Sequence, residues 1–252
     1  MPRMTDNNNM NNINIPGPGT FTFSGIRPEK LGATEYTLVT IVVDETGSVA
    51  DFADELLKTV RSIVKACAGH PRADNLLIRL LGFNDQIKEV HGFRPLTGIN
   101  ADDYDPFQPA GMTALYDAVY SAIGATLTYA KILTDQDFDV NAAVYIITDG
   151  MDNRSTVTPK MIAEKVRQAQ IGEEIESMVS VLIGLNESNG HRRNDVSQYL
   201  QDFKDDAQLT RYIDAGKAEA KTLARLANFV SQSISSQSQA LGSGRTSQQL
   251  TF

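Results

Sequence analysis

Three short segments of the chain bring hydroxyl and carboxylate oxygens to the ends of apolar or helical patterns. The first follows an apolar run that ends at Val43, the second precedes a helical stripe that starts at Leu115, and the third ends an apolar run at Thr148. Such oxygens are hard ligands, which Mg²⁺ prefers in an octahedral shell that often keeps waters. The segments therefore predict a divalent cation site. Its candidate ligands are Asp44, Thr46, Ser48, Thr113 and Asp149.

The elements that would position these residues follow from the hydrophobic pattern. Four runs rich in Val, Ile and Leu have the composition of strands buried on both faces, as in a parallel sheet. Apolar stripes at three- and four-residue steps separate them and predict helices. The alternation predicts an α/β fold, with a doubly wound, mostly parallel sheet that carries helices on both faces. The runs are residues 36–43, 75–83, 142–148 and 177–185.

Weaker patterns complete this scaffold. A turn at Asn84 and Asp85 precedes residues 86–91, which predict one short antiparallel edge strand, and residues 209–213 predict a further strand. Pro159 suits the first position of a helix that starts near Thr158. The other predicted helices cover residues 53–67, 115–123 and 223–234.

Composition divides the chain into one folded domain and two flexible ends. Residues 1–34 are rich in Asn, Pro and Gly and predict a flexible arm. Within them, residues 20–24 alternate polar and aromatic types, which fits a short edge strand or a peptide that docks elsewhere. Residues 35–236 form the predicted domain, and the Ser/Gln-rich residues 237–252 predict a disordered tail.

The topology of such a sheet brings the candidate ligands together. The carboxyl ends of parallel strands open into a crevice where the strand order reverses. If the strands that precede Asp44 and Asp149 flank this reversal, their ends are adjacent, and Thr113 reaches the same point from the loop before its helix. Because hydroxyl ligands are neutral, they leave the ion's charge uncompensated. A carboxylate from outside could then complete the coordination shell, so we expect a protein partner that presents Asp or Glu.

The same segments resemble a known site. An Asp-x-Thr-x-Ser motif at residues 44–48, then Thr113, then Asp149 followed by Gly150, is similar to the metal-ion-dependent adhesion site of von Willebrand factor A domains. The resemblance runs from about Tyr36 to at least Leu185, and the family commonly has Ser where this chain has Thr46.

This resemblance implies a role for each candidate ligand. It implies that the hydroxyls of Thr46 and Ser48 bind the ion directly, and that Thr113 binds it directly or through water. It implies direct or water-mediated contact for Asp44 and Asp149. It also implies a bacterial or phage-like, single-domain protein that works within a multi-protein assembly.

Three functions remain open at this point. The first is a metal-dependent protein-binding module, and the second is a structural subunit of an assembly with a structural metal. The third is a Mg²⁺-dependent phosphatase with Asp44 as nucleophile, but phosphatases of the haloacid dehalogenase type need a second Asp where this chain has Thr46. The chain also has no Walker loop and no Gly-x-Gly-x-x-Gly motif. We therefore expect a binding protein and no enzyme.

Bulk properties limit the partners. A net charge of -8 disfavours binding to nucleic-acid phosphates. The single cysteine, Cys67, forms no internal disulfide, and no window has the length and apolarity of a membrane-spanning helix. Without a secretory signal pattern, the sequence predicts a cytoplasmic protein that does not bind membranes. Oxygen ligands alone do not separate Mg²⁺ from Mn²⁺.

Overall fold

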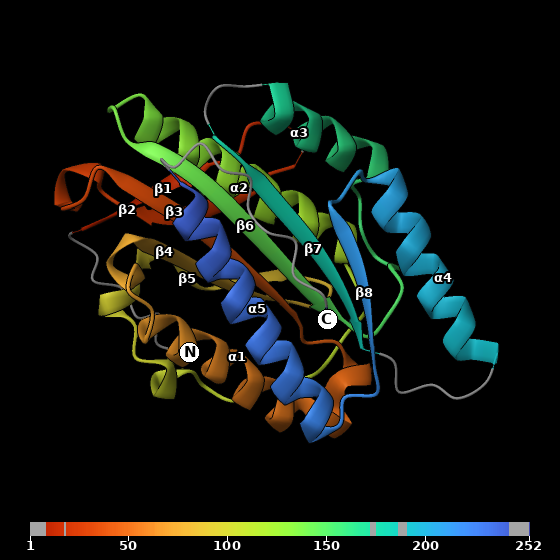
Figure 1. Ribbon diagram of the computed structural model, residues 1–252. Helices are drawn as coiled ribbons and strands as arrows, with labels where there is room; N and C mark the ends of the chain where they lie inside the picture. The colour runs from red at the N-terminus through yellow and green to blue at the C-terminus, as the bar shows by residue number, and fades with distance from the viewer. Residues whose placement is uncertain (1–8, 18, 172–174, 186–190, 242–251) are drawn as a thin grey trace.

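The computed structural model describes residues 9–17, 19–171, 175–185, 191–241 and 252. A single eight-stranded sheet runs through it in the order β1-β2-β5-β4-β3-β6-β7-β8 (Figure 1). From β4 through β3, β6 and β7 to β8, neighbouring strands are parallel. The strands are β1 (Met10–Asn14), β2 (Thr22–Ile26), β3 (Glu35–Asp44), β4 (Leu76–Phe83), β5 (Ile87–Pro95), β6 (Asp139–Thr148), β7 (Met178–Leu185) and β8 (Arg211–Gly216).

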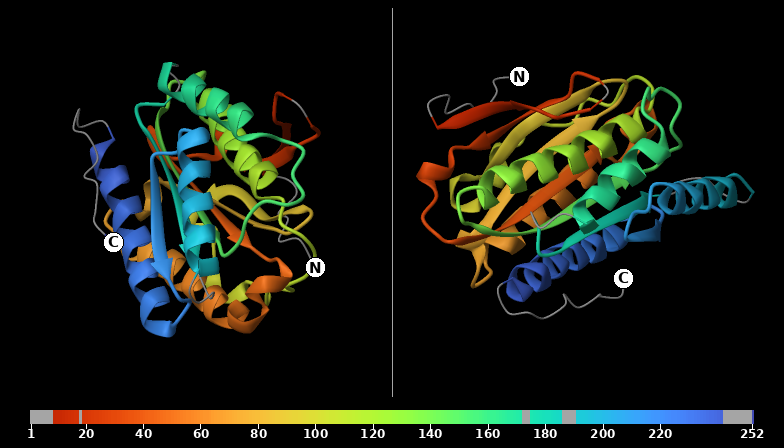
Figure 2. Two further views of the ribbon diagram at one scale, coloured as in Figure 1. Left: turned by 90° about the vertical axis from the view of Figure 1, so that its right-hand side faces the viewer. Right: turned by 90° about the horizontal axis from the view of Figure 1, so that it is seen from above.

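Helices cover both faces of this sheet (Figure 2). One face carries α1 (Ala53–Ala68) and α5 (Ala220–Ala240), and the other carries α2 (Leu115–Thr134), α3 (Pro159–Ile171) and α4 (His191–Asp206). No helix in the described parts of the chain is both long and apolar enough to cross a membrane. The predicted fold class, an α/β fold with a mostly parallel sheet between two helical layers, is confirmed.

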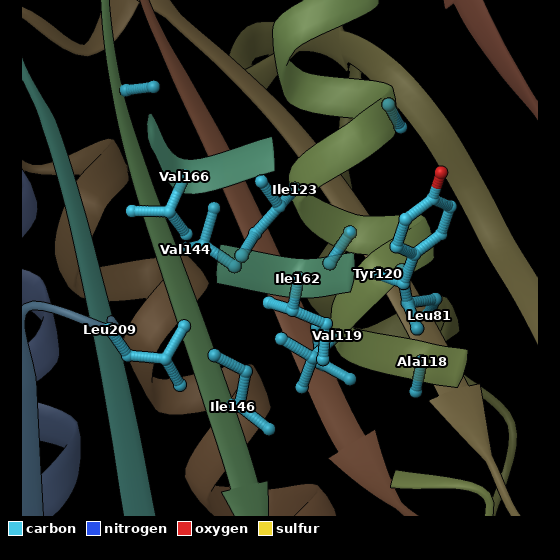
Figure 3. Packing of buried hydrophobic residues seen from close by; sticks show 14 of the residues in the cluster. Leu81, Ala118, Val119, Tyr120, Ile123, Val144, Ile146, Ile162, Val166 and Leu209 are labelled. Carbon is cyan, nitrogen blue, oxygen red and sulfur yellow. The ribbon is translucent and has the colours of Figure 1, made fainter. Parts of the chain in front are cut away.

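The two central strands are apolar because both of their faces are covered. Every residue of β6 after Asp139 is buried, and its side chains alternate between two apolar clusters. Val144 and Ile146 lie in the cluster under α2 and α3, close to Val119 and Ile162 (Figure 3). Their neighbours along the strand pack on the opposite face, against α1 and α5. This two-sided burial explains why the sequence of β6 shows no polar alternation.

The antiparallel strand predicted after the turn at Asn84 and Asp85 is β5, but it does not form the edge of the sheet. It pairs with β4 in antiparallel orientation. Its other side carries β2, and β1 lies beyond β2.

Residues 9–34 differ from the predicted flexible arm, because much of this segment belongs to the sheet. Ile15 and Phe23 are 5% and 2% exposed. The Tyr129 hydroxyl on α2 donates to the carbonyl oxygen of Ile26 at 2.5 Å, which ties the end of β2 to the core. A few apolar side chains at suitable positions therefore order a segment whose average composition favours disorder. Residues 1–8 and 18 of the predicted arm lie outside the described residues.

The predicted disordered tail is wrong for its first residues. Residues 237–240 continue α5. Gln237 is buried, and its Nε2 donates to the Ala142 carbonyl oxygen and to Ser177 Oγ at 3.2 and 2.7 Å. These bonds extend the helix over the sheet past residue 236. Residues 242–251 lie outside the described part of the chain.

Replacing Phe23 with alanine is expected to lower the free energy of unfolding by about 3 kcal/mol, because it removes a buried ring that packs on Phe93 and Tyr129. Urea unfolding followed by circular dichroism measures this change. Asn11→Ala, at an exposed position of β1, is the control and should change stability by less than about 0.5 kcal/mol. Unchanged stability of Phe23→Ala would instead support the flexible arm that the sequence predicts.

Candidate metal centre

The strand order reverses between β3 and β6. From β3 the chain passes to β4 on one side, and it later returns to β6 on the other side. The pairing of Val43 with Ile147 places the ends of the two strands next to each other. This is the crevice in which open α/β sheets bind ligands. The expected adjacency of the Asp44 and Asp149 segments is therefore present.

Asp44 is a buried carboxylate at the end of the central strand, with an exposed fraction of 0%. Its Oδ1 accepts a hydrogen bond from the backbone nitrogen of Thr46 at 2.9 Å, and its Oδ2 accepts one from Thr148 Oγ1 at 2.6 Å. Burial raises the pKa of Asp44, and the hydrogen bonds from Thr148 and Thr46 oppose that rise. A cation beside this group would stabilise its charged form further.

A chain of hydrogen bonds links Thr46 and Ser48 to the residue that follows β6. Thr46 Oγ1 and Ser48 Oγ lie 2.9 Å apart, and Ser48 Oγ donates to Asp149 Oδ1 at 2.8 Å. Thr46 is buried, Ser48 is exposed and Asp149 is half-buried. The oxygens therefore run from the interior to the surface, where a partner could approach.

Thr113 approaches the same place from the loop before α2. Its backbone nitrogen donates to Asn153 Oδ1 at 2.8 Å, and its carbonyl oxygen accepts from the backbone nitrogen of Asn153 at 3.0 Å. A β-carbon at Gly150 would lie 3.9 Å from Thr113 Oγ1. The Thr113 hydroxyl is thus beside the residue that follows Asp149. All five predicted ligands therefore gather at the carboxyl ends of the central strands β3 and β6.

Two acidic side chains fasten the loop after β6 to the start of α2. Asp117 Oδ1 accepts from the backbone nitrogens of Thr156 and Val157 at 3.0 and 2.8 Å. Asp152 Oδ1 accepts from the backbone nitrogen of Tyr116 at 3.2 Å. These bonds satisfy backbone groups and hold together the two elements that carry Thr113 and Asp149.

Glu45, which lies between Asp44 and Thr46 in the sequence, is a buried carboxylate. Its exposed fraction is 3%, and its side chain lies over Gly82 of β4, where a β-carbon would collide with it. Burial raises the pKa of Glu45, and the charge of Lys88 opposes that rise. In the sequence, the sign of this contact is the glycine inside the apolar run of β4, since a glycine within a strand often marks a place where another group packs closely against the backbone. Thr148 was likewise missed as the donor to Asp44.

The donor set fits a hard divalent cation. It consists of three hydroxyls and two carboxylates, without a nitrogen or sulfur ligand, which suits Mg²⁺ or Mn²⁺. In the part of the chain that the structure describes, no group of three or more His, Cys, Asp or Glu side chains gathers to hold a metal. A metal at this edge would therefore depend on the hydroxyls of Thr46, Ser48 and Thr113.

Comparison with known proteins gives structural matches only. No family model matches the sequence, and neither does any curated protein. PilB minor pilin from Streptococcus sanguinis is similar with a TM-score of 0.56 and 16% identity, over 83% of this chain and 64% of that one. A von Willebrand factor type A protein from Catenulispora acidiphila gives 0.51 and 15%, over 85% and 44%. The pilus adhesin SpaC from Lactobacillus rhamnosus GG, in an open conformation, gives 0.54 and 12%, over 93% and 35%.

At these identities the likeness shows the fold alone. The chain has the α/β fold of von Willebrand factor type A proteins, as the resemblance of its motifs implied. It spans less than two thirds of the length of each of these three chains.

Thr148→Val is expected to destabilise the protein by about 1–3 kcal/mol in EDTA, because it removes the hydroxyl donor from the buried Asp44 carboxylate while keeping the side-chain shape. Thr148→Ser keeps the hydroxyl and is the matched control. Chemical unfolding at pH 7 compares the two. Equal stability of the Val and Ser variants would contradict a stabilising role for this bond.

Proposed function

We propose that this chain is a metal-dependent protein-binding module, with Mg²⁺ or Mn²⁺ at the strand-end site and an acidic side chain of a partner protein as the external ligand. The observation that carries the proposal is the buried Asp44 carboxylate, which lies at the start of an oxygen chain that reaches the surface at Ser48 and Asp149. The net charge of -8 argues against nucleic acid as the partner.

Each residue has a role in this proposal. The hydroxyls of Thr46, Ser48 and Thr113 would hold the ion directly, while Asp44 and Asp149 would do so directly or through water. The bound ion would supply positive charge at the surface. Because the three hydroxyl donors are neutral, a partner's carboxylate would complete the coordination shell with an anionic oxygen ligand.

The surroundings of Asp44 support binding rather than turnover. A nucleophilic carboxylate must be presented to the substrate, whereas the Asp44 side chain is fully buried. Thr46 stands where the dehalogenase-type phosphatases need an acid/base carboxylate. We therefore propose no enzymatic activity.

A structural role in an assembly is the second candidate function. It is favoured by the likeness to a minor pilin and a pilus adhesin. The same names favour a cell-surface setting, whereas the sequence predicted the cytoplasm, and both compartments stand as proposals that fractionation of the native host would separate. In this candidate function the metal stabilises the fold and binds no partner.

Adding Mg²⁺ or Mn²⁺ is expected to raise the midpoint of thermal unfolding, by an equivalent of about 2.7 kcal/mol at a hundredfold excess over Kd. Ser48→Ala and Asp149→Asn should lower the affinity for the ion roughly tenfold or more, since each removes one oxygen ligand. Calorimetric titration measures the affinities. Asp105→Asn, an exposed acidic residue outside the site, is the charge-matched control. Unchanged affinity in the two site variants would place the ion elsewhere.

A pull-down from the native host is expected to capture a protein in Mg²⁺ that is lost in EDTA and with Ser48→Ala. The exposed position of Ser48 makes it a suitable change, because the fold does not depend on its burial. Mass spectrometry identifies the partner, and circular dichroism checks that the variant is folded. A partner retained in both conditions would contradict the binding module and favour the structural role, for which light scattering would show self-assembly.

A further inference from the structure

A fully buried arginine interrupts the apolar face of β4. Arg79 lies between Leu77 and Leu81, which belong to the cluster under α2 and α3, and its exposed fraction is 0%. Its Nε donates to Glu89 Oε2 of β5 at 2.8 Å, and its guanidinium carbon lies 5.9 Å from the centre of the Phe23 ring. Neither Nη1 nor Nη2 has a hydrogen-bond partner among the residues that the structure describes.

A cavity lies beside this guanidinium, where β2 and β5 diverge. These strands pair at a single position, Gly25 with Phe93. Before that position, Ser24 bridges the strands through its backbone nitrogen and Oγ, which donate to Glu89 Oε1 at 2.9 and 2.6 Å. The cavity between them measures about 160 Å³. Its lining includes Asn12, Phe21, Thr22, Arg79, Glu89 and Ser121.

The unpaired amino groups of Arg79 need acceptors. A buried donor without an acceptor costs about 1–3 kcal/mol, and more when the group is charged. Burial lowers the pKa of Arg79 and the charge of Glu89 opposes this, but a guanidinium stays protonated in proteins. Deprotonation therefore does not remove the cost of the unpaired donors. The two amino groups instead favour an occupant of the cavity that supplies acceptor oxygens.

We propose that this cavity binds a small monocarboxylate, whose two oxygens accept hydrogen bonds from Nη1 and Nη2 of Arg79. The end of a guanidinium is a planar fork that matches the two oxygens of a carboxylate. Glu89 accepts from Nε and leaves Nη1 and Nη2 without a partner among the described residues. Its negative charge repels a dianion such as phosphate more strongly than a monoanion. Phe21 supplies an apolar wall for the carbon end of the ligand, and Asn12 supplies a polar group.

Entry to this site involves the N-terminal hairpin of β1 and β2. Because Arg79 is covered in the structure, a ligand reaches it only after the hairpin or a side chain over it shifts. Only one backbone pairing joins β2 to β5, so a local shift of the hairpin beside the cavity breaks few backbone hydrogen bonds. The proposal concerns residues of β1, β2, β4, β5 and α2, and it does not depend on the metal centre.

The test is a titration of ¹⁵N-labelled protein with acetate at constant ionic strength, followed through the backbone amide signals. EDTA is present throughout, so that acetate cannot bind an ion at the metal centre. We expect saturable shifts centred on Ser24 and Glu89, with weaker binding of phosphate and of neutral acetamide. Shifts that acetamide reproduces equally, shifts centred elsewhere, or no saturable shift would overturn the proposal.

Two substitutions assign the binding to the guanidinium. Arg79→Lys keeps the positive charge but loses the planar pair of amino groups, so it should lower the affinity for acetate at least tenfold. Arg94→Lys on β5, the control, should leave the affinity for acetate unchanged. Unchanged binding in Arg79→Lys would contradict the proposal. If Arg79→Lys does not fold, the comparison of acetate with acetamide in the unaltered protein decides the question.

Discussion

The carboxylate of Asp44 is buried at the end of the central strand, and much of the surrounding structure compensates its charge. A charge in this position is stable only if hydrogen bonds or a counter-ion replace the lost water. Thr148 on the neighbouring strand and the backbone of Thr46 provide hydrogen bonds. They can do so because β3 and β6 pair in register up to their ends. The parallel arrangement of the two strands, their two-sided burial and the reversal of strand order thus converge on one carboxylate.

The central part of this arrangement could be predicted from the sequence because its signals are local. The Val, Ile and Leu runs of β3, β4, β6 and β7 have their observed bounds within a few residues, since a strand covered on both faces leaves little choice of side chain. Helix α4 was not predicted, because only a thin stripe of Val196, Leu200 and Phe203 faces the core. The continuation of α2 beyond residue 123 was also missed, although Tyr129 and Leu133 are buried on it.

Long-range pairings account for most of the remaining differences. The Asn-rich composition of the N-terminal segment hid the burial of Ile15 and Phe23, which depends on contacts with residues about a hundred positions away on α2. Arg79 gave no usable signal within its apolar run, because its partner Glu89 belongs to the next strand and the cavity beside it is formed by β1, β2 and α2 as well. At the candidate metal centre, the gathering of the five candidate residues at the strand ends was predictable from their motifs, but the burial of Glu45 depends on its contact with Gly82.

The loop that follows β6 has a consequence for recognition. Asp117, Asp152 and Asn153 bind backbone groups of this loop and of the start of α2, so the segment is ordered before any ligand arrives. The loss of conformational entropy that accompanies ordering, about 1–2 kcal/mol for each backbone residue fixed, has therefore been met during folding. Preorganisation of this kind leaves more of the interaction energy available for affinity. Under the proposed function, selectivity then depends on whether the partner's carboxylate matches a fixed spacing of oxygens, rather than on how far the loop can adapt to it.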